Sequence, residues 1–177
     1  MRAFVLYLTY LRIALSPLVF ILIAFLDYLY LGLFVFVIAS MSDFFDGFLA
    51  RKFSVESELG EVLDPIADKI LTLFALLAII TYTNDIYITF ICALIISREF
   101  WVSGLRIASN SNQNTQTLKV SYLGKLKTAF QFFSVFTYFF GFAINNSLIT
   151  FLATFLLFLS MLLGLKSGLD YSKKFFS

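Results

Sequence analysis

The sequence predicts an all-α integral membrane protein with six transmembrane helices and both termini at the cytoplasmic face. Of its 177 residues, 60% are hydrophobic and the mean hydropathy is +0.92, whereas soluble domains contain about 45–50% apolar residues. The apolar residues fall into six runs, and each is near the roughly 20 residues that a spanning helix needs. Lys and Arg occur in alternate connections, as the positive-inside rule requires.

The six apolar runs predict the helices in order. They cover 7–26, 31–48, 64–82, 86–105, 123–144 and 148–165. Asp64 stands before Pro65, which predicts an N-cap followed by proline at the first position of the third helix. The polar residues 83–85 predict a turn before the fourth helix. No repeat or soluble segment is visible, so we expect residues 1–177 to form a single membrane domain.

Lys and Arg lie on one side of this predicted layout. The connections on the opposite side, near Asp27, Asp85 and Asn145, contain neither residue. This asymmetry places both termini and the charged stretch between the second and third runs at the cytoplasmic face. We therefore expect a multi-pass membrane protein in contact with membrane lipids. Its predicted location is the bacterial-type inner (plasma) membrane. The net charge of +2 gives no basis for nucleic-acid binding.

The absence of histidine limits the chemistry. It excludes a Ser-His-Asp triad, a His general base and a His-ligated zinc or haem. Acid–base chemistry must therefore use Asp, Glu, Lys or Tyr. The single cysteine, Cys92, lies inside an apolar run, and we expect it to be a small buried hydrophobic residue.

Four aspartates lie in the charged stretch. They are Asp43, Asp46, Asp64 and Asp68. Spacings of three and four place the members of each pair on one helix face, and the segment between can bring the pairs together. Carboxylates near a bilayer are costly, and divalent cations would remove the repulsion among four of them. Oxygen-only ligands suit Mg²⁺, Mn²⁺ or Ca²⁺, and two ions would form a clamp for a pyrophosphate group.

Small residues and one cation accompany the aspartates. They are Gly47, Ala50, Arg51 and Gly60. The small residues leave room for a flat nucleotide against the helices, and Arg51 can pair with a phosphate or with an aspartate. The alternative interpretation is structural: the aspartates would cap helix ends, and Arg51 would be an ordinary cytoplasmic anchor.

The run D-x2-D-G-x2-A-R-x8-G-x3-D-x3-D, from Asp43 to Asp68, resembles the signature of the CDP-alcohol phosphatidyltransferase family. The resemblance implies a six-helix membrane fold, usually a homodimer, that binds CDP-diacylglycerol through two divalent ions, Mg²⁺ or Mn²⁺. It implies that Asp43, Asp46 and Asp64 are metal ligands, and that Asp68 is both a ligand and the general base. By the same resemblance Gly47, Ala50, Arg51 and Gly60 contact CDP-diacylglycerol.

Four further cations follow on the same predicted face. They are Arg98, Arg106, Lys125 and Lys127. Such a cluster favours an anionic acceptor, and a phosphate suits it. The segments RE, SGLR and GKLKT that contain these residues resemble the phosphatidylglycerophosphate-forming branch of the family, as do Thr9, Arg12 and Pro17. The resemblance implies sn-glycerol 3-phosphate as the acceptor. A Pro-Asn pair that usually opens the branch is absent here.

Three alternatives remain open from the sequence. A sibling enzyme would use another acceptor, as in cardiolipin, phosphatidylinositol phosphate or phosphatidylserine synthesis. A divalent-cation transporter would use the aspartates as a binding site, although these lie at helix ends on one face. A structural membrane protein would carry its cations only for topology, but it leaves the aspartate pattern unexplained.

Overall fold

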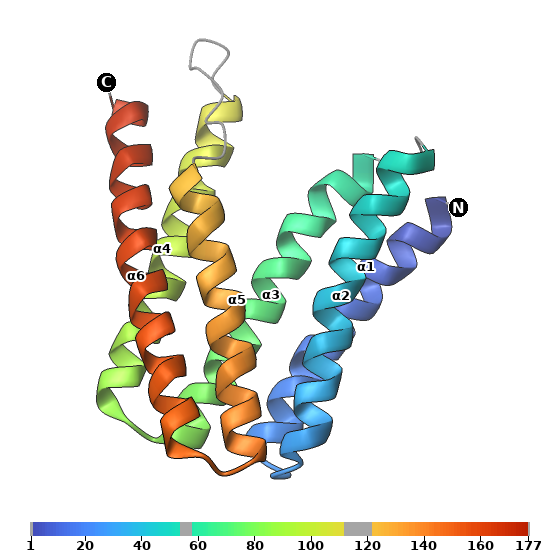
Figure 1. The fold of residues 1–177 in the computed structure, drawn as a ribbon. Helices are drawn as coiled ribbons and strands as arrows, with labels where there is room; N and C mark the ends of the chain where they lie inside the picture. The colour runs from blue at the N-terminus through green and yellow to red at the C-terminus, as the bar shows by residue number, and fades with distance from the viewer. Residues whose placement is uncertain (1, 54–57, 112–121, 177) are drawn as a thin grey trace. The chain divides into compact units, whose positions relative to one another are not determined.

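The computed structural model describes residues 2–53, 58–111 and 122–176. Within these ranges, the side chains of 2–5, 43–53, 58–59, 61–62 and 110–111 are not described. The described residues form six helices (Figure 1): α1 Arg2–Ala24, α2 Leu29–Phe53, α3 Glu58–Thr83, α4 Ile86–Ser111, α5 Tyr122–Ala143 and α6 Ser147–Phe176. The described residues form no strand, which confirms the prediction of an all-α fold.

Three of the helices contain described stretches that are long and apolar enough to cross a membrane. These stretches are Leu6–Ala24, Ile86–Ser109 and Ser147–Phe176, and α2 contributes a shorter apolar stretch, Leu29–Ser42. Many large hydrophobic side chains are exposed, including Phe90 at 64% and Phe151 at 74%. A soluble surface rarely presents so much apolar area, so these faces fit contact with lipid.

The short connections confirm the predicted turns. Asp27, Asn84 and Asn145 have positive φ angles of 56°, 47° and 50°, a conformation that Asp and Asn adopt more readily than other residues with a side chain. Asp85 then caps α4, because its Oδ1 accepts hydrogen bonds from the amides of Tyr87 at 2.7 Å and Ile88 at 3.1 Å. This cap satisfies donors that the first turn of a helix leaves without a partner.

The prediction for the start of the third helix is wrong. α3 begins at Glu58, so Asp64 is not an N-cap and Pro65 lies inside the helix. Proline removes one backbone donor from a helix, but six residues before Asp64 continue the helical path in the N-terminal direction. As a result Asp64 and Asp68 both project from a continuous helix.

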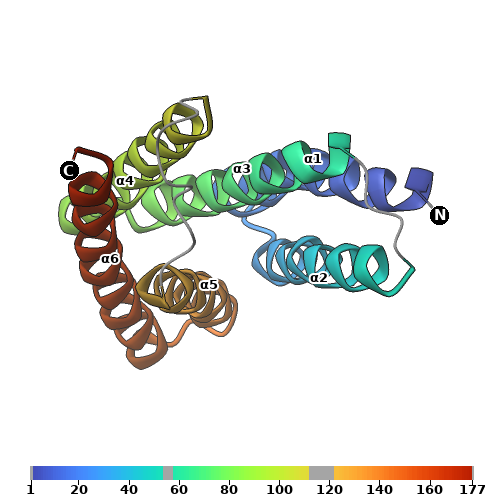
Figure 2. The ribbon, with the colours of Figure 1, turned by 90° about the horizontal axis from the view of Figure 1, so that it is seen from above.

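The chain divides into two compact units, which we describe separately. Unit 1 comprises residues 1–83 and 139–146, and unit 2 comprises residues 84–138 and 147–177. In unit 1, α1 packs against both α2 and α3, as the view from above shows (Figure 2). In unit 2, α4 lies beside α6. The prediction of a single domain over residues 1–177 stays a prediction.

Small residues allow close packing in unit 1. Ala67, Ala75 and Ala78 are fully buried along α3. Where α2 begins, Gly32 lies against Ile23 so closely that an added Cβ would be 2.9 Å from the Ile23 Cδ1. The absence of a side chain at Gly32 therefore permits the tight α1–α2 hairpin.

Hydrogen bonds between helices stabilise unit 2. The fully buried Ser134 donates to the Ala153 carbonyl oxygen at 2.8 Å, which joins α5 to α6. The hydroxyl of Tyr138 lies 2.7 Å from that of Thr154. Cys92 is fully buried and free, as predicted.

Candidate functional site

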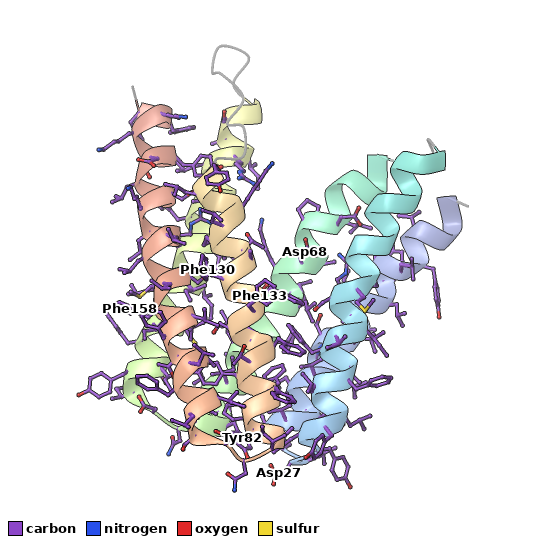
Figure 3. The ribbon with its side chains drawn as sticks, viewed as in Figure 1. Asp27, Asp68, Tyr82, Phe130, Phe133 and Phe158 are labelled. Carbon is purple, nitrogen blue, oxygen red and sulfur yellow. The ribbon has the colours of Figure 1, made fainter. Side chains whose placement is uncertain are left out.

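The aspartate stretch spans the last turns of α2 and the first half of α3. Asp43, Asp46, Gly47, Ala50 and Arg51 lie on α2, but their side chains are outside the part of the chain that the structure describes. On α3, Gly60 is buried, Asp64 is partly buried and Asp68 is exposed. Figure 3 shows Asp68 part-way along α3, well away from the turn residue Asp27 at the bottom of the view.

Asp64 and Asp68 both receive a hydrogen bond from α1. The hydroxyl of Thr9 donates to Oδ1 of Asp64 at 2.8 Å, and Nη1 of Arg12 donates to Oδ1 of Asp68 at 2.8 Å. Thr9 and Arg12 are three residues apart, whereas the aspartates are four apart. Both intervals are close to one helical turn, so the two contacts lie one above the other.

Arg12 also reaches the second aspartate-bearing helix. Its Nε donates to the hydroxyl of Ser42 at 3.3 Å, and this hydroxyl in turn donates to the Ala39 carbonyl oxygen at 2.7 Å. Ser42 directly precedes Asp43 on α2. The guanidinium thus joins α1 to both helices that carry the aspartates, while its side chain is 0% exposed.

The described donors fit a hard divalent cation. Asp64 and Asp68 are one turn apart on one face of α3, and carboxylate oxygens are the ligands that Mg²⁺ and Mn²⁺ prefer. Among the described side chains, which do not include those of Asp43 and Asp46, no group of three potential ligands occurs. The assignment of all four as ligands stays a prediction.

Sequence reasoning did not assign Thr9, Arg12 or Ser42 to the site. One signal was available, because Thr9 and Arg12 are polar residues at helical spacing inside the first apolar run. An arginine in such a run is costly unless it has a partner. That partner, Asp68, is 56 residues away, and helix periodicity does not predict contacts over this distance.

Unit 2 contains a buried cluster of charges. Arg98 and Lys127 both bind Oε1 of Glu99; the Arg98 Nη1 contact measures 3.2 Å. The side chains of Arg98 and Lys127 are 9% and 6% exposed, and that of Glu99 is 20% exposed. Two cations share one carboxylate, so this cluster has a net charge of +1.

Helix α6 holds Arg98 in place. Nε of Arg98 donates to the Gly164 carbonyl oxygen at 3.0 Å, and Nη2 donates to the hydroxyl of Ser167 at 3.1 Å. A Cβ on Gly164 would lie 3.3 Å from Cγ of Lys127, and a Cβ on Gly168 would lie 3.4 Å from Cγ of Arg98. The small residues of α6 therefore make room for both cations, although the sequence offered no motif there.

The other predicted acceptor cations differ in their surroundings. Arg106 donates from Nη2 to the Tyr171 hydroxyl at 3.0 Å, and its guanidinium carbon lies 5.1 Å from the Tyr171 ring centroid. Lys125 is exposed. Among the described residues, Nε of Arg106 and Nε2 of Gln131 are buried without a hydrogen-bond partner. A buried donor without a partner costs about 1–3 kcal/mol, so these atoms are candidates for contact with a polar ligand.

The structure thus brings Arg98 and Lys127 together through Glu99, and it places Arg106 against α6 through Tyr171. The prediction that these cations lie close to the aspartates stays a prediction.

Comparison with known proteins decides the family. The family model for CDP-alcohol phosphatidyltransferase matches residues 6–165. The chain belongs to the CDP-alcohol phosphatidyltransferase family. The match includes the aspartate stretch, Thr9 and Arg12 on α1, and all four predicted acceptor cations.

Several curated bacterial proteins of the CDP-alcohol phosphatidyltransferase family are similar to this chain. A protein of Pectobacterium atrosepticum is 36% identical over 132 residues, which cover 73% of this chain and 72% of the relative. One from Rickettsia typhi is 40% identical over 131 residues, covering 73% and 71%. A third, from Salmonella typhimurium, is 33% identical over 127 residues, covering 70% and 69%. Each is named CDP-diacylglycerol–glycerol-3-phosphate 3-phosphatidyltransferase.

Proposed function

We propose that the protein transfers the phosphatidyl group of CDP-diacylglycerol to sn-glycerol 3-phosphate, giving phosphatidylglycerophosphate and CMP. One observation carries this proposal: Asp64 and Asp68, the last two aspartates of the family signature, are held side by side on α3 by α1. The family match and the names of the bacterial relatives support the same reaction.

The donor half of the reaction uses the aspartate stretch. Asp43, Asp46, Asp64 and Asp68 would hold two divalent ions, Mg²⁺ or Mn²⁺, which when bound neutralise the pyrophosphate of CDP-diacylglycerol and the departing CMP. Gly47, Ala50, Arg51 and Gly60 bind the cytidine and its phosphates. The spacing of these residues and the oxygen-only ligand set support this assignment.

The acceptor half uses the cations of unit 2. Arg98, Arg106, Lys125 and Lys127 bind the phosphate of the acceptor. The net charge of +1 on the buried Arg98–Glu99–Lys127 cluster supports an anionic ligand, because an uncompensated buried charge is costly. The unpartnered buried Nε of Arg106 supports a ligand that accepts hydrogen bonds.

The reaction is a direct displacement at phosphorus. Asp68 accepts the proton from an acceptor hydroxyl, and that oxygen attacks the β-phosphorus in line. The new phosphorus–oxygen bond forms as the bond to the CMP oxygen breaks. The protein contributes mainly by positioning the two substrates and by compensating their charges.

We also propose a membrane location, an orientation and an oligomeric state for the enzyme. We place six spans in the inner (plasma) membrane of a bacterial cell, with both termini and the site at the cytoplasmic face, in a homodimer of single-domain chains. The distribution of Lys and Arg supports this orientation, and the apolar stretches of α1, α2, α4 and α6 support the membrane location.

A reaction with purified protein tests the function. The protein in detergent micelles, with CDP-diacylglycerol and Mg²⁺ or Mn²⁺, should release CMP only when glycerol 3-phosphate is added, and mass spectrometry should identify phosphatidylglycerophosphate. Asp68→Ala should abolish the release. CMP release with a different alcohol alone would overturn the acceptor, and full activity of Asp68→Ala would overturn the assigned base.

A further inference from the structure

We propose that Thr9 and Arg12 of α1 are positioning residues that orient the Asp64 and Asp68 carboxylates for a divalent ion. This inference rests on the proposed function, because it concerns the same aspartates. Neither α1 residue belongs to the set of ligands proposed above. Their role is instead to fix the direction in which the α3 carboxylates face.

Two residues of α1 are paired with two residues of α3. Thr9 binds Asp64 and Arg12 binds Asp68, at sequence separations of 55 and 56 residues. The residue numbers on both helices are higher in the second pair than in the first, so α1 and α3 run in the same direction. At about 1.5 Å per residue, the donors are separated by about 4.5 Å along their helix and the acceptors by about 6 Å. The two contacts are therefore made by adjacent turns of each helix.

One oxygen of each carboxylate accepts the hydrogen bond from α1. In both aspartates the contact is made by Oδ1, at 2.8 Å. An aspartate side chain that is free to change its rotamer loses conformational entropy when its carboxylate binds a metal ion. A hydrogen bond to one oxygen restricts the rotamer in advance, which is the usual role of groups that contact metal ligands.

The buried position of Arg12 is costly. A guanidinium that is 0% exposed is expensive in an apolar helix unless it is paired. Arg12 binds Asp68 on α3 and Ser42 on α2, next to Asp43. One buried residue thus links α2 and α3, the two helices that carry the four aspartates.

The test compares variants that leave the net charge unchanged. Thr9→Val removes the hydroxyl at constant shape, and Arg12→Lys keeps the cation but cannot reproduce both contacts. Ser16→Ala is the matched control, because Ser16 is a fully buried residue of α1 whose hydroxyl donates to a carbonyl of its own helix. Thr9→Ser is the conservative variant that retains a donor.

The measurement is Mn²⁺ binding to the full-length protein in detergent, followed by the paramagnetic resonance signal of free Mn²⁺. Thr9→Val and Arg12→Lys should bind Mn²⁺ about 10- to 100-fold more weakly, as for other groups that contact metal ligands. Ser16→Ala and Thr9→Ser should bind like the wild type. The apparent KM for Mn²⁺ in CMP release should rise in parallel.

The outcomes separate this proposal from the proposed function. Wild-type affinity for Mn²⁺ in both Thr9→Val and Arg12→Lys, with only a lower unfolding temperature, would overturn the positioning role. If Thr9→Val does not fold, Thr9 is needed for the stability of the protein, and this outcome would also overturn its positioning role. By contrast, a wild-type protein that binds no Mn²⁺ and releases no CMP would overturn the proposed function itself.

Discussion

Arg98 of α4 donates a hydrogen bond from Nε to the carbonyl oxygen of Gly164 on α6, at 3.0 Å. The contact requires a close approach of the arginine stem to α6, which the missing side chain of Gly164 allows. The same glycine lies against Lys127. Helix α6 therefore supports two of the four cations that we assign to the acceptor.

Gly164→Ala should impair use of the acceptor without destabilising the helix. The new Cβ would lie 3.3 Å from Cγ of Lys127, so the lysine must shift by a few tenths of an ångström. We expect the KM for glycerol 3-phosphate to rise, by up to about tenfold, with the KM for CDP-diacylglycerol unchanged. Gly104→Ala is the control, because nothing lies within 4 Å of a Cβ there. Equal kinetics in the two variants would contradict the prediction.

Glu99→Gln should destabilise unit 2. The substitution leaves Arg98 and Lys127 buried without their shared carboxylate, and removal of one partner from a buried ion pair costs about 3–5 kcal/mol. Thermal unfolding followed by circular dichroism measures the loss. The double variant Glu99→Gln, Lys127→Met should recover much of the stability but not the activity with glycerol 3-phosphate. If Glu99→Gln is as stable as the wild type, the ion pairs of Glu99 with Arg98 and Lys127 contribute nothing to the stability of unit 2.

Lys125→Ala should weaken acceptor binding while leaving the fold intact, since Lys125 is exposed. A hydrogen bond between charged groups contributes about 1.5–3 kcal/mol, so we expect the KM for glycerol 3-phosphate to rise about 10- to 100-fold. Lys166→Ala, which removes an exposed cation of α6, serves as the control and should match the wild type. If both variants have the same KM for glycerol 3-phosphate, Lys125 does not bind the acceptor and serves only to orient the chain in the membrane.

Gly32→Ala should destabilise the α1–α2 hairpin. A methyl group there would overlap the side chain of Ile23; overpacking costs about 1–3 kcal/mol, whereas replacing glycine in a helix gains about 0.5–1 kcal/mol. We expect a net loss of up to about 2.5 kcal/mol, measured as a lower unfolding temperature. Combining it with Ile23→Ala should cost less than the sum of the two single changes, because the two side chains compete for one space. Strict additivity would contradict the proposed overlap.

The sequence was sufficient to predict the helices because each is a long apolar run bounded by polar residues. It failed at the start of α3, where Asp64 and Pro65 look like a helix start but the helix begins at Glu58. Local preferences for a cap and for proline at the first turn cannot show whether earlier residues also become helical. The mixture of charged, apolar and glycine residues in 58–64 is compatible with either outcome.

For the candidate site, the sequence predicted residue types better than contacts. The aspartates and cations follow from spacing and charge. Their partners do not: Thr9 binds Asp64 from 55 residues away, and Ser167 binds Arg98 from 69 residues away. Serine, threonine and glycine are common in membrane helices for several reasons, so only the packing of α1 and α6 reveals which of them support charged groups.

The pairing of Arg12 with Asp68 has a consequence for how the protein is made. The two residues are 56 positions apart, and synthesis at about 5–20 residues per second separates them by about 3–11 s. If α1 enters the membrane during this interval, it does so with an arginine whose acidic partner Asp68 has not yet been made. A chain released before Asp68 would retain an arginine without that counter-charge. The contact can therefore form only after synthesis has passed Asp68.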